Sequence, residues 1–380
     1  VAVVLLAAII LKPGKKDLSA VFETVESRRY LLFYLVMILG IPFAYHRHEA
    51  FNYIFLVYLM NILFFVVFLL MVDSIQKIKG VIFAVSLSVF CYSVFSLLEG
   101  RLSDGRLFIY GKMFDPNDIA YVLVSLSPLS LFYLVSEYSF IKKALAAVSV
   151  LLSIIVILLS GSRSGLIALA VTSMLFVFSG LGGIKRSHKV AFLAGVAVVM
   201  LLYHVNINTE RYMTLANIGS DYNVTDEFGR MQIWERALDL FLSNPITGVG
   251  VNCFAMAIGY LRDSLNLSPK WQATHNSYIQ VGVETGAIGL ALFISIVVSC
   301  FKNFTALSRT EPSTGENHEL KTIAGLLRIG FIGHLIGAFF LTQGYSMYFT
   351  MFFAFSAALR KVHPQSEMPG IKRPLHGSRT

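Results

Sequence analysis

Long apolar runs separated by short polar segments make up most of the chain. Runs such as Phe51–Val72 and Ile323–Leu341 contain few polar residues. A helix needs about 20 mostly apolar residues to cross the roughly 30 Å hydrocarbon core of a bilayer, whereas a membrane β-barrel shows shorter, alternating segments. The pattern therefore predicts an all-α polytopic membrane protein.

The positions of these runs define the expected spans. We expect spans at about 30–45, 51–73, 80–98, 119–137, 144–160, 165–182, 190–205, 280–301, 323–342 and 345–359. Residues 1–11 are apolar but too few to cross a bilayer, so we interpret them as the end of a further helix. The expected total is about 11–12 transmembrane helices.

The composition agrees with a membrane environment, because 56% of the residues are hydrophobic and only 14% are charged. The formal net charge of +9 is spread over short connections, which argues against a nucleic-acid partner. One set of alternate connections holds 20 Lys and Arg residues and the other holds 10, so the richer set is expected in the cytoplasm. The three cysteines match neither a disulfide framework nor a zinc site.

This orientation places the longest connection on the outer side of the membrane. We expect N-terminal transmembrane helices over 1–205, a large periplasmic loop over 206–279, C-terminal transmembrane helices over 280–362 and a cytoplasmic basic tail over 363–380. Within the loop, the spacing of apolar residues from Asp226 to Leu242 predicts an amphipathic helix on the membrane surface. Asp226 is its expected N-cap, and Asn244–Pro245 is expected to end it.

Two arginines on the outer side are candidate anion-binding residues. Arg163 stands in the turn Ser160–Gly165, where small residues leave backbone amides open at the start of a helix. Arg230 lies in the first turn of the loop helix, where a cation opposes the helix dipole. The alternatives are that Arg163 reaches toward lipid headgroups and that Arg230 is a solvated charge.

His275 stands just before a span, and its pKa class suits a general base near neutral pH. The alternative is a structural role, which is the commoner one for a single His. Glu284 lies inside the start of the same span, where we expect it to pair with an Arg or to orient a ligand. On the physics alone, the glycines that follow mainly permit close helix packing.

The segment Asp115–Asp118 precedes another span on the outer side. Asn117 or Asp118 is expected to cap the helix that begins near residue 119. A site for a metal ion or for sugar hydroxyls is the alternative, although the spacing matches no known metal-binding loop.

Several of these motifs together resemble the O-antigen ligases. His275–Asn276, nine residues and Gly286-Ala287-Ile288-Gly289 match the signature H-[NSQ]-x9-G-x-x-[GTY] in full. Ser160–Gly165 and Gly229–Trp234 are similar to other hallmarks of the wider ligase and polymerase superfamily, and Asp115–Asp118 is similar to a segment in its members. The twelve spans of the family are not all present in this sequence.

The resemblance implies an inverting, metal-independent glycosyltransferase with a type-C membrane fold and no cofactor. It would move an O-antigen chain from undecaprenyl diphosphate to the lipid A-core, at the periplasmic face of the bacterial inner membrane, in lipopolysaccharide biosynthesis. The resemblance makes His275 the general base and makes Arg163 and Arg230 the residues that hold the donor diphosphate. The expected supporting residues are Ser162, Asn276, Glu284 and Arg211.

Three alternatives remain open at this stage. An O-antigen or exopolysaccharide polymerase would use the same donor with a second lipid-linked glycan as acceptor. A transporter or flippase of a lipid-linked glycan would place Arg163, Glu284, Arg328 and His334 along a path through the membrane. A purely structural membrane protein would leave the basic residues and the His of the loop unexplained.

Overall fold

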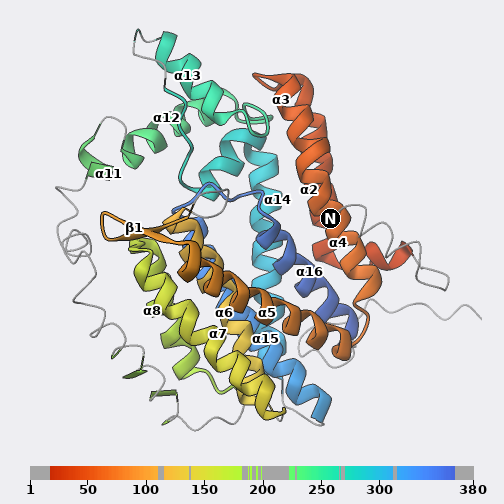
Figure 1. Cartoon of the computed structure of the whole chain (residues 1–380). Helices are drawn as coiled ribbons and strands as arrows, with labels where there is room; N and C mark the ends of the chain where they lie inside the picture. Colours follow the sequence, from red (N-terminus) through yellow and green to blue (C-terminus); the bar gives the residue numbers. More distant parts are fainter. Residues whose placement is uncertain are drawn as a thin grey trace, which may run out of the picture.

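The computed structural model describes residues 18–109, 115–136, 138–181, 222–226, 229–264, 266, 270–310 and 315–363, together with a few positions between 187 and 198. Helices make up nearly all of this part of the chain (Figure 1). The expected span 190–205 lies largely outside the described residues. The fragment 1–11 and the tail 364–380 lie outside them as well.

The α-helices outside the 206–279 loop form one bundle. Their bounds are α2 Val25–Gly40, α3 Arg47–Asn52, α4 Leu59–Met71, α5 Ile75–Glu99, α6 Pro116–Val135, α7 Phe140–Leu159, α8 Arg163–Phe178, α14 Ser277–Ser308, α15 Gly315–Ala338 and α16 Met347–Val362. The short helix η1 covers Leu18–Val21, η2 covers Ile41–Phe43, and a π-helical turn, η3 Tyr53–Tyr58, joins α3 to α4.

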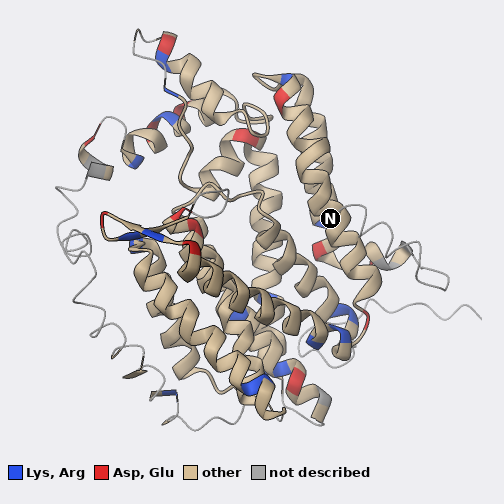
Figure 2. Ribbon diagram, viewed as in Figure 1, with Lys and Arg blue, Asp and Glu red and all other residues tan. Residues whose placement is uncertain are grey.

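Six helices of the described chain are long and apolar enough to cross a membrane. They are Arg47–Met71, Ile75–Glu99, Pro116–Val135, Phe140–Leu159, Ser277–Ser308 and Asn317–Ala338. The helix α8 is also apolar but shorter. Lys and Arg lie toward the helix ends and leave most helix middles uncharged (Figure 2). The chain is therefore an all-α polytopic membrane protein, as the apolar runs predicted.

The centre of the bundle is α6, which packs against α5, α7, α8 and α15. Three glycines of α15 permit its close approach to α6. A Cβ on Gly330 would meet the backbone oxygen of Ser125, one on Gly333 would lie 3.1 Å from the backbone oxygen of Val124, and one on Gly337 would meet the ring of Tyr121. In lipid, helices associate through such close backbone contact, because lipid tails are as apolar as the side chains.

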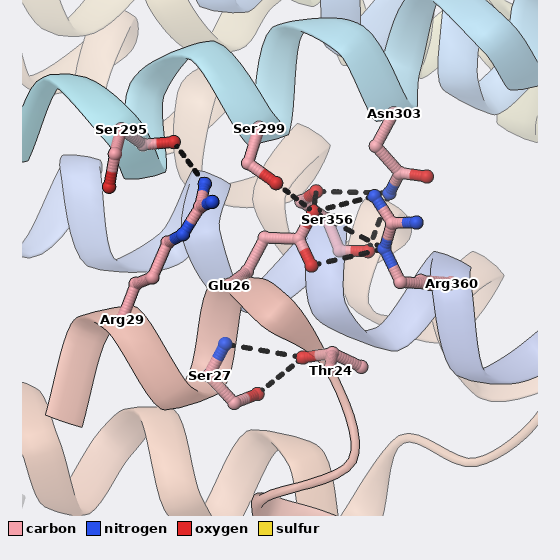
Figure 3. A network of polar contacts seen from close by, with 9 residues as sticks. All are labelled: Thr24, Glu26, Ser27, Arg29, Ser295, Ser299, Asn303, Ser356 and Arg360. Carbon is pink, nitrogen blue, oxygen red and sulfur yellow. Dashed lines mark hydrogen bonds and ion pairs between the residues drawn. The ribbon is translucent and has the colours of Figure 1, made fainter. Parts of the chain in front are cut away.

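A buried ion pair joins α2 to α16 (Figure 3). The carboxylate of Glu26 is fully buried and accepts hydrogen bonds from Nε and Nη2 of Arg360, the shortest at 2.9 Å. Ser299 of α14 donates a further bond to Glu26 at 2.9 Å, and Arg29 donates to the backbone oxygen of Ser295 at 2.9 Å. A buried charge is tolerated when it is paired and hydrogen-bonded in this way, so the network holds three helices together.

The connections that the charge count grouped on the outer side gather at one end of the bundle, which we call the loop face (residues 44–50, 101–108, 161–164, 229–276 and 339–346). Hydrogen bonds show this grouping: the amide of Tyr45 donates to the carbonyl of Val249 at 2.9 Å, and the side-chain Nε of Arg106 donates to the carbonyl of Ser160 at 3.2 Å. The helices α12 and α13 lie over this end (Figure 1).

The described part of the loop, from residue 222 on, contains the helices α11 Tyr222–Thr225, α12 Arg230–Ser243 and α13 Phe254–Ser264. The prediction that Asp226 caps the amphipathic helix is wrong. The helix begins at Arg230 with Gly229 at the N-cap, and the carbonyl of Asp226 instead accepts a bond from the Gly229 amide. The predicted end of this helix is confirmed, because Asn244 is its C-cap.

The apolar residues of α12 divide into a buried set and an exposed set. Ile233, Ala237 and Leu240 are buried, whereas Leu238 and Leu242 are 55% and 64% exposed. The helix therefore packs one stripe onto the protein and presents a second apolar stripe to its surroundings.

A short hairpin, absent from the sequence prediction, lies in the connection between α5 and α6. Its strands β1 Arg101–Ser103 and β2 Arg106–Phe108 are antiparallel and pair Ser103 with Arg106. The two-residue turn is Asp104–Gly105, and both residues have positive φ, at 50° and 69°. Asp-Gly is the strongest short-range signal for such a turn, so the sequence did contain a usable indication.

Candidate active site

His275 occupies a strained backbone position directly before α14. Its φ is +50°, which is uncommon for a residue with a side chain. The conformation is held from both sides: the His275 amide donates to Oγ1 of Thr342 at 2.8 Å, and Asn276 caps α14 by accepting bonds from the amides of Tyr278 and Ile279 at 2.9 and 3.1 Å. The site thus fixes His275 between the α14 N-terminus and the connection from α15 to α16.

The surroundings of His275 favour its neutral form. Burial lowers the pKa of the imidazole below its ordinary value of 6.5, and the positive charge of Arg230 lowers it further. The carboxylate of Asp115 acts in the opposite direction and raises the pKa. A neutral imidazole can accept a proton at neutral pH, as a general base must.

Arg230 lies near enough to His275 for its charge to lower the His275 pKa, and the anchoring of α12 explains this position. It is the first residue of that helix, and its guanidinium carbon lies 6.0 Å from the ring centroid of Phe340. One turn further on, Trp234 donates from Nε1 to the backbone oxygen of Thr274 at 2.9 Å. This bond attaches α12 directly to the segment that carries His275.

Arg163 begins α8 in the expected turn. Ser162 is the N-cap, and its Oγ accepts a bond from the amide of Gly165 at 3.2 Å. Gly165 lets α8 approach α6, because a Cβ there would collide with the side chain of Ala120. Both Ser160 and Ser162 are buried, whereas Arg163 is partly exposed. The turn therefore has a rigid base and an accessible cation.

The first turn of α6 lies between the Arg163 turn and His275. The prediction that Asn117 or Asp118 caps this helix is wrong: the cap is Asp115, which accepts the amide of Asn117 at 2.9 Å. Pro116 occupies the first helical position, where its missing N–H is of no consequence. This frees the Asn117 side chain to accept a bond from Ser162 at 2.9 Å.

The other side of the same turn reaches the His275 segment. Asp118 accepts a bond from Nε2 of Gln343 at 3.0 Å. Gln343 directly follows Thr342, the residue that holds the His275 amide. Contacts from α8 and from the His275 segment therefore meet on one turn of α6.

The helix α14 is interrupted at Gly286, whose φ is 67° and whose ψ is −173°. A Cβ at this position would collide with the backbone of Ile246. The amide of Ala287 is turned outward and donates to the carbonyl of Pro245 at 2.8 Å. Non-helical backbone at this depth is acceptable only because another protein segment satisfies it. The glycine of the signature is thus required by backbone geometry.

Glu284 holds the loop to this interruption. Its buried carboxylate accepts bonds from the amides of Asn252 and Phe254, at 3.0 and 3.2 Å. The backbone oxygen of Glu284 accepts a further bond from the amide of Gly250 at 3.1 Å. Glu284 therefore anchors the start of α13 to α14, the helix that begins directly after His275.

Other expected residues stand apart from this arrangement. Arg211 lies outside the described residues. His334 is buried in the bundle, where its two ring nitrogens share hydrogen bonds with Tyr121 at 3.2 Å and Ser125 at 3.3 Å. Among the described residues, no three His, Cys, Asp or Glu side chains gather as a metal ion would require.

Sequence reasoning did not identify Thr342, Gln343 or Arg106 as part of this site. Thr342 and Gln343 follow an apolar run and carry no motif of their own, so only the fold reveals their contacts with His275 and Asp118. Arg106 stands directly after the Asp-Gly turn of the hairpin. The Asp-Gly pair predicts that turn, but it does not predict the contacts of Arg106.

Residues 148–294 match a family model described as O-antigen ligase. This range is less than half of the chain and includes Arg163, Arg230 and His275. The chain is also 30% identical over 125 residues to the exopolysaccharide production protein ExoQ of Rhizobium meliloti (strain 1021), an alignment that covers 30% of this chain and 27% of ExoQ. The resemblance inferred from the motifs is confirmed over the matched range, and it supports a function of the ligase or polymerase type.

Proposed function

From the match of residues 148–294 to the O-antigen ligase family, we propose that the protein is a glycosyltransferase that transfers O-antigen polysaccharide from undecaprenyl diphosphate to lipid A-core. The reaction would take place at the periplasmic face of the bacterial inner membrane. Under this proposal the loop face is periplasmic, and membrane lipid surrounds the bundle.

The placement of His275, held by Thr342 directly before α14, is the observation that carries the proposal. Burial and Arg230 lower its pKa, so the imidazole is neutral at pH 7, and its backbone is fixed by Thr342. As the acceptor hydroxyl attacks the anomeric carbon, the imidazole takes the hydroxyl proton. A new glycosidic bond forms while the bond from the anomeric carbon to the diphosphate oxygen breaks. Attack from the face opposite the leaving group inverts the anomeric configuration.

The two arginines account for the other half of the reaction. Charge develops on the diphosphate as its bond to the sugar breaks, and guanidinium groups stabilise that charge through two parallel hydrogen bonds. Arg163 begins α8, whose N-terminal amides also favour an anion, and the charge of Arg230 acts on the proposed base. In this proposal the arginines supply the charge that neutralises the leaving group, and no metal ion is needed.

A polymerase of O-antigen or exopolysaccharide is the second candidate. It would use the same donor chemistry with a second lipid-linked glycan as acceptor. The similarity to a protein named for exopolysaccharide production favours this candidate. The complete histidine signature favours the ligase.

A transfer assay tests the proposal. Purified protein is given an undecaprenyl-diphosphate-linked glycan together with lipid A-core, with and without EDTA, and is compared with His275→Ala and Arg163→Ala. We expect transfer that survives EDTA and is lost in both variants. Chain growth on undecaprenyl diphosphate without transfer to lipid A-core would favour the polymerase, and full activity of His275→Ala would remove the proposed base.

A further inference from the structure

Arg106 of the hairpin contacts the turn that carries Arg163. Its Nε donates to the backbone oxygen of Ser160 at 3.2 Å, and its Nη2 donates to Oδ1 of Asn117 at 3.3 Å. Gly161 has a φ of 59°, and a Cβ there would lie 3.0 Å from Cγ of Arg106. The glycine therefore leaves room for the Arg106 side chain to cross the turn. One guanidinium group thus joins the end of α7 to the start of α6.

Asn117 is the centre of this arrangement. Its side-chain oxygen accepts bonds from both Arg106 and Ser162, the latter at 2.9 Å. Its side-chain nitrogen donates to Oδ1 of Asp115 at 3.0 Å. The donors at the side-chain oxygen and the carboxylate at the side-chain nitrogen together fix the orientation of the Asn117 amide. A continuous set of bonds therefore runs from Arg106 through Asn117 to Asp115.

The two ends of this set act on the two halves of the proposed site. Ser162 caps α8, and Arg163 is the first residue of that helix. The carboxylate of Asp115 raises the pKa of His275, so Asp115 interacts electrostatically with the proposed base. A shift of Asn117 would move the Arg163 turn and the Asp115 carboxylate together.

We propose that Arg106 and Asn117 are positioning residues that set the Arg163 turn relative to His275, and thereby the donor diphosphate relative to the base. This inference rests on the proposed function. Arg suits the task better than Lys, because its planar fork donates from two nitrogens in fixed directions, whereas an ammonium group is a single point charge. Misplacement of a bound substrate by about 1 Å is enough to cost roughly 100-fold in rate.

The experiment measures binding of undecaprenyl diphosphate, without a glycan, to purified protein in lipid nanodiscs. The variants are Arg106→Lys, Arg106→Ala and Asn117→Ala. Arg101→Lys is the matched control, because Arg101 is an exposed arginine on the partner strand of the same hairpin. Arg163→Ala reports the loss of the proposed diphosphate contact itself. Turnover with the full donor gives kcat and the donor and acceptor KM values for each variant.

We expect Arg106→Lys and Asn117→Ala to raise the donor Kd and to lower kcat/KM for the donor by about 10- to 100-fold. The acceptor KM and the thermal unfolding midpoint should stay close to those of Arg101→Lys, because a purely structural defect would change them as well. Equal donor binding and equal kcat/KM in Arg106→Lys and Arg101→Lys would overturn the positioning role alone. Failure of the native protein to bind the donor lipid would overturn the proposed function and this inference together.

Discussion

Glu26 and Arg360 are 334 residues apart in the chain and form an ion pair between α2 and α16, in which the carboxylate is fully buried and the arginine side chain is 14% exposed. The serine of α14 that shares this carboxylate, Ser299, makes the pair a junction of three helices (Figure 3). Removing one partner would leave the other charge buried and unpaired, which costs far more than an exposed pair contributes.

Glu26→Gln should therefore destabilise the protein by about 3–5 kcal/mol. The matched control is Asp73→Asn, which breaks the Lys77–Asp73 pair, whose side chains are 44% and 46% exposed. That change should cost less than about 1 kcal/mol. Thermal unfolding in one detergent compares the two variants, and equal midpoints would contradict a stabilising role for the buried pair.

The pH dependence of transfer should follow His275. Its neutral form is the base, so kcat/KM falls as the pH falls through the His275 pKa, which burial and Arg230 hold below 6.5. Arg230→Gln removes a positive charge and should move this acid limb to higher pH. Asp115→Asn keeps a residue able to cap α6 and should move the limb to lower pH.

The measurement is a pH profile of kcat/KM from about pH 5 to 8 for the native protein and both variants. Shifts in opposite directions are the expected signature. A shift of the two variants in the same direction, or an acid limb that stays in place, would argue against His275 as the titrating base.

Gly286→Ala should abolish transfer and lower stability. The backbone conformation of Gly286, with φ 67° and ψ −173°, is essentially restricted to glycine and costs a residue with a side chain roughly 1–3 kcal/mol, and the added methyl group would collide with the backbone of Ile246. Gly80→Ala is the control, because nothing lies within 4 Å of a Cβ at that position in α5. We expect Gly80→Ala to keep full activity and an unchanged or higher unfolding midpoint. An active, stable Gly286→Ala variant would contradict the assigned backbone geometry.

The proposed periplasmic position of the loop face is open to cysteine labelling. Asp104 at the hairpin tip and Lys77 in the first turn of α5 are both exposed. Most of the length of α5, which is about 37 Å, separates Lys77 from the hairpin. In a background with Cys91→Ser, a membrane-impermeant maleimide should label Asp104→Cys in intact spheroplasts and label Lys77→Cys only after lysis. The reverse pattern would invert the proposed orientation.

Much of the architecture could be predicted from the sequence, because the bilayer imposes a simple rule. Backbone groups in hydrocarbon must bond within their own segment, so an apolar run of sufficient length becomes a helix. This rule located the helices from Ile75 to Leu159 to within a few residues. The motifs led to the hypothesis of a site at Arg163, Arg230 and His275: Arg163 and His275 adjoin apolar runs, and Arg230 lies in the first turn of the loop helix.

Only the tertiary structure decided which polar groups meet. Thr342 holds His275 across 67 residues, and Gln343 reaches Asp118 across 225 residues, distances over which no local periodicity carries information. The N-cap of α6 is Asp115 and not, as predicted, Asn117 or Asp118, because Pro116 at the first helical position sets the start of the helix. Glu284 was expected to pair with an arginine or to orient a ligand. Its carboxylate instead accepts hydrogen bonds from the backbone amides of Asn252 and Phe254 in the loop. The sequence thus determined the helices through local burial, and the fold determined the site through contacts between distant segments.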